Sequence, residues 1–138
     1  MGNPGSHVTL KHADTDFPLF RLADVYLMLA EASLQNGDAA TALTYMNYVR
    51  ERAYGGSSHN FSSVTLDDVL DERSKELYWE CTRRTDLIRF NKFTGSDLVW
   101  SFKGGATDGT AVDDFRVLYP LPTYDIVNNP NLTQNSGY

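Results

Sequence analysis

The sequence has only one cysteine among its 138 residues, so an internal disulfide framework is excluded. Its three histidines have no cysteine partners at the spacing of zinc ligands, and this excludes a structural zinc site. No apolar run has the length of a bilayer-spanning helix, because Asp24 and Glu31 interrupt the longest one. We therefore expect a fold that depends on its apolar core, with neither a metal nor another cofactor.

Basic residues are also scarce. The sequence has 12 lysines and arginines and 18 acidic residues, which gives a formal net charge of -6. Such a surface repels nucleic-acid phosphates and anionic lipid headgroups. Binding to nucleic acid or to a membrane surface is therefore not expected.

The first residues lack the basic and apolar regions of a signal peptide, and residues 1–12 are interpreted as a tag or a flexible lead. Apolar residues make up 41% of the sequence, enough for one compact core but not for two. Residues 13–138 are therefore predicted to form a single helical domain.

Two apolar segments joined by a short turn dominate the first half. Apolar residues fall on several sides of residues 17–34, which predicts a buried helix that Gly37 can end. Asp38 can cap a second helix that ends at Gly55, and so short a connection favours an antiparallel helical hairpin. Its pattern is tetratricopeptide-like, with Tyr26, Leu29, Ala30, Gly37, Ala42 and Met46 at the expected places. One such unit cannot bury both of its faces, so the hairpin is expected to end a longer array or to be covered by the rest of the chain.

Beyond the hairpin, Thr65 and Asp68 have the spacing of a capping box and predict a third, long helix that runs to about Phe90. Glycines then break residues 91–115 into loops, with short strand pieces expected at 98–102 and 115–119. A single helical turn is predicted at 123–127. The expected fold is mostly α: a tetratricopeptide-like hairpin plus a third long helix, with an irregular C-terminal region rich in Gly, Pro and Asn packed over it.

The predicted third helix carries a ladder of alternating charges at three- and four-residue spacing. Its members are Glu72, Arg73, Glu76, Glu80, Arg83, Arg84, Asp86 and Arg89. Glu76 and Glu80 could be an acid and base pair, as in glycoside hydrolysis. A carboxylate paired with arginine stays ionised, however, and cannot deliver a proton near neutral pH. Because four arginines are interleaved, we predict a structural ion-pair ladder and no catalytic residue.

Three segments together resemble a known family. In chain order they are Phe17-Pro18-x-x-Arg21-Leu22-Ala23-Asp24-Val25-Tyr26-Leu27-Met28, then Glu72-Arg73-x-x-Glu76-Leu77-x-x-Glu80-x-x-Arg83-x-x-Asp86-Leu87-Ile88-Arg89-Phe90, and finally Tyr119-Pro120-Leu121-Pro122 with Asn129-Pro130-Asn131-Leu132. This set is similar to the C-terminal part of the SusD/RagB family. Cys81 departs from the pattern, since the family usually has glycine there. Members are also several times longer and begin with a lipoprotein signal and a lipidated cysteine.

The resemblance implies a non-enzymatic protein on the outer surface of a Gram-negative outer membrane. Such a protein would bind oligosaccharide and pass it to a SusC-type TonB-dependent transporter. Its only membrane attachment would be an N-terminal lipid anchor, which we expect to lie outside this chain. Two other classes stay open: a tetratricopeptide-like protein–protein adaptor and, ranked behind it, a glycoside hydrolase.

Sugar binding in this family resembles the stacking of sugar rings on exposed aromatic side chains. Trp100 and Phe102 lie in the Gly-rich loop and are the candidates for carbohydrate stacking, although packing against the helices is an alternative for both. Trp79, on the predicted third helix, is expected to be a packing residue.

Overall fold

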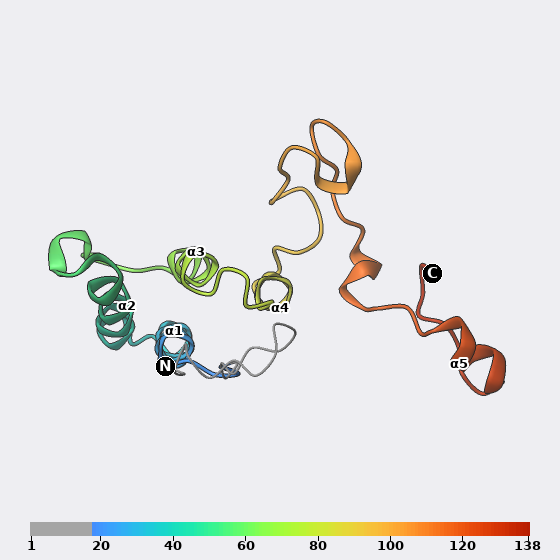
Figure 1. Ribbon diagram of the computed structural model, residues 1–138, viewed down its shortest axis with the longest axis horizontal. Coiled ribbons are helices and arrows are strands. Elements are labelled where there is room, and N and C mark those ends of the chain that lie inside the picture. Colours follow the sequence, from blue (N-terminus) through green and yellow to red (C-terminus); the bar gives the residue numbers. More distant parts are fainter. Residues whose placement is uncertain (1–17) are drawn as a thin grey trace, which may run out of the picture. The chain divides into compact units, whose positions relative to one another are not determined.

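The computed structural model describes residues 18–138 and is mostly helical in that part (Figure 1). Its helices are α1 (Leu22–Gln35), α2 (Ala39–Tyr54), α3 (Leu66–Glu76), α4 (Arg83–Arg89) and α5 (Thr123–Asn128), with short 3-10 helices η1 (Ser57–His59), η2 (Lys103–Gly105) and η3 (Asp114–Val117). The predicted fold class is thereby confirmed. The expected lead at residues 1–12 lies outside the described residues. Within the described chain, no helix is long and apolar enough to cross a membrane.

Helices α1 and α2 pack against each other as the predicted hairpin. The side chains between them are fully buried, and two of these, Ala30 and Ala42, are small enough to let the helix backbones approach closely. Leu27 and Met46 fill the space beside them. The prediction of a helix buried on several sides is only partly right, because Leu22 and Val25 on α1 are exposed.

The ends of the hairpin helices follow from single residues. Gly37 has a φ of 80°, and Gly55 caps α2 with a φ of 72°, both in the left-handed region that glycine adopts without strain. The Oδ1 of Asp38 accepts a hydrogen bond from the Thr41 amide at 3.0 Å, so the predicted cap of α2 is present. Helix α1 begins at Leu22, with Arg21 as its N-cap residue.

The third helix is interrupted, which corrects the prediction of one long helix. Its capping box forms as expected: the Thr65 amide donates to Asp68 Oδ2 at 2.8 Å, and the Asp68 amide donates to Thr65 Oγ1 at 3.2 Å. The helix then ends at Glu76, and α4 starts only at Arg83. Between them, Trp79 and Cys81 have φ angles of 68° and 61°, which a right-handed helix cannot accommodate.

The C-terminal region is irregular, as expected, but the predicted strand pieces do not form. Residues 114–117 are the 3-10 helix η3 instead, and pairing in the described chain is limited to one isolated bridge between Gly95 and Val112. The helical turn predicted at 123–127 is present as α5. The segment after η3 contacts α4 at Arg84, whose guanidinium lies 4.3 Å from the centroids of the Phe93 and Tyr119 rings.

The chain divides into two compact units, one ending at Glu72 and the other beginning at Arg73. The boundary lies inside α3, so this helix contributes residues to both units. The organisation of residues 13–138 as a single domain stays a prediction.

Candidate functional site

The second unit has a cavity where α3 gives way to α4. Its volume is about 620 Å³, within the range of small-molecule sites. The residues lining it include Ser74, Leu77, Tyr78, Trp79, Cys81, Thr82, Arg83 and Trp100. Aromatic and aliphatic side chains thus combine with a few polar groups, which is the usual composition of a ligand site.

Both tryptophans of the chain line this cavity. Trp79 is 84% exposed and Trp100 is 57% exposed. The expectation that Trp79 is a packing residue is therefore wrong: it lies in the interruption of the third helix, outside any helical position. Phe102 is 70% exposed but is not among the lining residues, so the two predicted stacking candidates are not brought together.

Each of the two indoles contacts a neighbouring side chain. Trp79 meets the ring of Tyr78 edge-on, with 6.0 Å between centroids and an interplanar angle of 71°. The Lys103 ammonium lies 4.7 Å from the centroid of Trp100, as a cation–π contact. Gly109 lies so close to the Trp100 segment that a Cβ there would be 2.2 Å from the Trp100 carbonyl oxygen. The loop that carries Trp100 therefore has little room to shift toward Gly109.

A buried ion pair lies next to the cavity. Arg73 Nε, on α3, is 2.9 Å from Asp86 Oδ2 on α4, and both side chains are buried. The other oxygen, Asp86 Oδ1, accepts a hydrogen bond from Arg89 Nη2 at 2.9 Å. Asp86 thus connects the two helices across the interruption that exposes Trp79.

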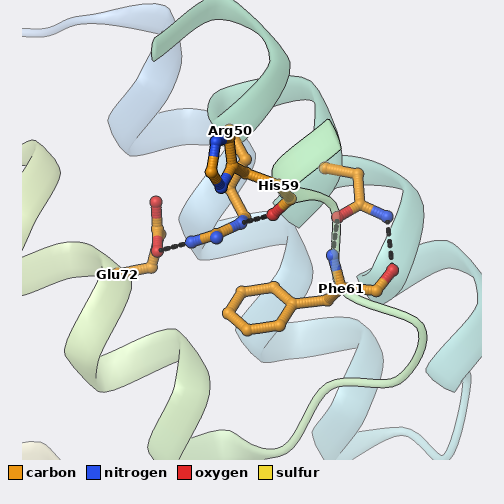
Figure 2. A network of polar contacts seen from close by, with 5 residues as sticks. Arg50, His59, Phe61 and Glu72 are labelled. Atoms are coloured by element: carbon orange, nitrogen blue, oxygen red, sulfur yellow. Dashed lines mark hydrogen bonds and ion pairs between the residues drawn. The ribbon is translucent and has the colours of Figure 1, made fainter. Parts of the chain in front are cut away.

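A second charged network belongs to the first unit (Figure 2). Arg50 on α2 donates from Nη1 to Glu72 Oε2 at 2.8 Å and from Nε to the His59 carbonyl at 2.6 Å. Its guanidinium also lies 4.1 Å from the centroid of the Phe61 ring. Asn47 holds Phe61 in place, because its side chain exchanges hydrogen bonds with the Phe61 carbonyl and amide.

The predicted ladder is therefore not one face of one helix. Glu72 pairs with Arg50, a residue that the sequence pattern did not indicate, while Arg73 pairs with Asp86. Glu76 is the last residue of α3, Glu80 lies in the interruption, and Arg83 begins α4. Arg84 donates to the backbone carbonyls of Arg116 and Val117, at 2.8 and 3.2 Å, instead of to a carboxylate of the ladder. No sequence signal linked Arg50 to Glu72, since 22 residues separate them.

No group of three or more His, Cys, Asp or Glu side chains in the described residues could hold a metal ion. The cavity itself offers exposed aromatic faces, with hydroxyl and guanidinium groups at their edges.

The comparisons with known proteins agree on one family. The model described as "SusD family" matches residues 2–138. The chain is 44% identical over 137 residues to "Starch-binding protein SusD" of Bacteroides thetaiotaomicron, which covers 99% of this chain and 24% of that protein. A SusD-like protein of Formosa agariphila is 37% identical over 139 residues, covering 92% of this chain and 25% of that protein. The chain thus spans about a quarter of the length of the curated relatives it matches.

Solved structures show the same relationship. A SusD superfamily protein from Bacteroides fragilis aligns with a TM-score of 0.67 at 30% identity, over 89% of this chain and 28% of that one. Another, from Parabacteroides distasonis, aligns with a TM-score of 0.63 at 26% identity, over 93% of this chain and 28% of that one.

Proposed function

Because this chain belongs to the SusD family, we propose that it is part of a carbohydrate-binding protein that works without catalysis and delivers oligosaccharide to a SusC-type TonB-dependent transporter. The resemblance predicted from three sequence segments is confirmed by the family match. Carbohydrate binding is supported by the 44% identity to a starch-binding protein. This chain spans 24% of the length of that relative. Carbohydrate binding by the whole protein is therefore proposed together with binding by this chain.

The observation that carries the proposal is the cavity with two exposed tryptophans. An exposed indole loses the free energy that burial would provide, so two of them at one cavity point to a binding surface. Trp100 stays a stacking candidate on this basis. Phe102 is exposed but lies outside the cavity, so it stays a stacking candidate only because it is close to Trp100 in the same loop.

The proposed location is the outer surface of the outer membrane, with attachment through a lipid anchor on the longer protein. Transfer of ligand to the transporter would require contact between the two proteins. Affinity purification of the full-length protein from detergent-solubilised outer membranes is expected to recover a TonB-dependent transporter in comparable amount. Recovery of the protein alone would contradict the partnership and leave carbohydrate binding untouched.

Carbohydrate binding is tested by isothermal titration calorimetry of the 138-residue chain with malto-oligosaccharides, chosen because one relative binds starch. Saturable heat without release of new reducing ends is the expected result. Hydrolysis that disappears in Glu76→Gln would contradict the proposal and support a glycoside hydrolase. Absence of binding to malto-oligosaccharides and to a panel of other neutral glycans would also overturn it for this chain.

A further inference from the structure

We propose that Trp79 and Trp100 together form a carbohydrate subsite at the junction of α3 and α4, which takes a short neutral oligosaccharide. This inference rests on the proposed function and adds the position of the site and the kind of ligand. Two indoles that are 21 positions apart in the sequence line one cavity of about 620 Å³.

The backbone at this cavity is strained. Trp79 and Cys81 both have left-handed φ angles, 68° and 61°, although side chains other than those of Gly, Asn and Asp rarely adopt them. Such strain persists only when the surroundings enforce it, and it concentrates at ligand sites. Here the Arg73–Asp86 pair joins the helices on either side of the strained turn. The fold thus accepts an unfavourable backbone and presents Trp79 to solvent.

The lining chemistry suits a sugar. The face of an indole carries negative potential and attracts the weakly positive C–H groups of a pyranose ring. Around the indoles, the hydroxyls of Ser74 and Thr82 and the guanidinium of Arg83 offer hydrogen-bond partners for sugar hydroxyls. This combination of a flat apolar platform with polar groups at its edge matches the two kinds of surface on a sugar ring.

The lining holds a ligand without the groups that would cut it. Two arginines line the cavity: Asp86 lies 2.9 Å from the Nε of Arg73 and offsets its charge, and Arg83 is the hydrogen-bond donor for sugar hydroxyls named above. Among the described residues that line the cavity there is no carboxylate. Glycoside hydrolysis uses a pair of carboxylates at the scissile bond, so this lining binds a sugar but does not supply the groups that hydrolyse it.

The experiment uses a property of this sequence: it has only two tryptophans, and both line the cavity. Intrinsic tryptophan fluorescence therefore reports on this site. Titration with malto-oligosaccharides is expected to give a saturable change whose midpoint agrees with calorimetry. Trp79→Phe and Trp100→Phe keep an aromatic face and leave one reporter each, so the remaining indole should still respond in both variants.

Removal of either ring is expected to weaken binding. Trp79→Ala and Trp100→Ala should each raise the dissociation constant by about tenfold, the effect of losing one aromatic contact. Tyr124→Ala is the matched control, because its ring is also exposed but lies on α5 outside the cavity. Its affinity should equal that of the parent chain.

The outcomes separate this inference from the proposed function. Calorimetric binding without a fluorescence change, and without an effect of the two alanine variants, would overturn the subsite but leave carbohydrate binding intact. Alanine variants that unfold at a lower temperature yet bind normally would make the indoles packing residues and overturn it too. No binding by either method would overturn both proposals for this chain.

Discussion

Asp86 shows how one buried charge holds two helices. Its side chain is 2% exposed. Its Oδ2 lies 2.9 Å from the Nε of Arg73 on α3, and its Oδ1 lies 2.9 Å from the Nη2 of Arg89 on α4. A buried carboxylate needs such partners, because the loss of hydration is otherwise uncompensated. The Arg73–Asp86 pair thus joins α3 to α4 across the turn that carries Trp79.

Asp86→Asn is expected to lower the free energy of unfolding by about 3 kcal/mol, because it removes the charge that both guanidiniums face. Urea denaturation followed by circular dichroism measures this. Asp113→Asn is the control: Asp113 lies 3.8 Å from Arg116 and both side chains are exposed, so the change should be within about 0.5 kcal/mol. Equal, small effects for the two variants would show that the buried pair contributes little.

Cys81→Gly is expected to stabilise the chain by about 1 kcal/mol. The cysteine has a φ of 61°, a region that costs most side chains energy but costs glycine little. Because Cys81 is exposed, its loss removes no core packing. Asn91→Gly is the comparison in thermal unfolding. Asn91 has a φ of 56°, but asparagine tolerates this region, so the variant should gain less stability than Cys81→Gly. A lower melting temperature for Cys81→Gly would contradict the strain argument.

At the scale of elements, the helix ends that depend on neighbouring residues were predictable. Asp38, Gly55 and the Thr65–Asp68 box act within four residues of the backbone groups they satisfy, and the structure has each of them. Such signals are readable because their physics is local.

The interruption between α3 and α4 was not predictable in the same way. Residues 77–82 contain neither proline nor glycine, and their charge spacing continues the helical pattern. One signal was present: the family resemblance places glycine where this chain has Cys81, and glycine at a fixed position indicates a positive φ. The exposure of Trp79 follows from that turn and was missed with it. The strand pieces at 98–102 and 115–119 failed because aromatic and β-branched residues there found no partner strand.

The cap of α2 makes a pH-dependent prediction. Hydrogen bonds from the side chain and then the amide of Thr41 lower the pKa of Asp38 below 3.8. A lowered pKa means that the stabilisation is complete above pH 3.8 and is lost as the pH falls through the pKa of the folded state. Asp38→Asn keeps a capping side chain but cannot titrate. The parent chain should therefore exceed it in stability near neutral pH, and the difference should vanish in acid. A difference independent of pH would contradict this assignment.

At the scale of the whole molecule, exposed apolar residues divide α1 into two faces. One face packs on α2, while Leu22, Val25 and Leu29 on the other are exposed. A tetratricopeptide-like hairpin needs neighbours to bury both faces. The exposed face is therefore expected to contribute little to the stability of this chain.

A pair of valine substitutions measures the difference between the faces. Val25 is 42% exposed and Val49 on α2 is 2% exposed. Val25→Ala should leave the free energy of unfolding within about 0.5 kcal/mol, whereas Val49→Ala should lower it by about 1–3 kcal/mol through the cavity it creates. Similar losses for both variants in chemical denaturation would mean that the exposed face is covered in solution.

Helix α3 sets a limit on how this chain can be dissected. Adjacent residues, Glu72 and Arg73, form ion pairs with Arg50 in the first unit and with Asp86 in the second. The helix has 11 residues, fewer than the roughly 12–15 that an isolated helix needs to persist in water. A gene fragment that stopped at Glu72 would leave a still shorter helix, and one that began at Arg73 would lose its capping box. The shortest piece that can be expressed with either ion pair intact must therefore carry all of α3.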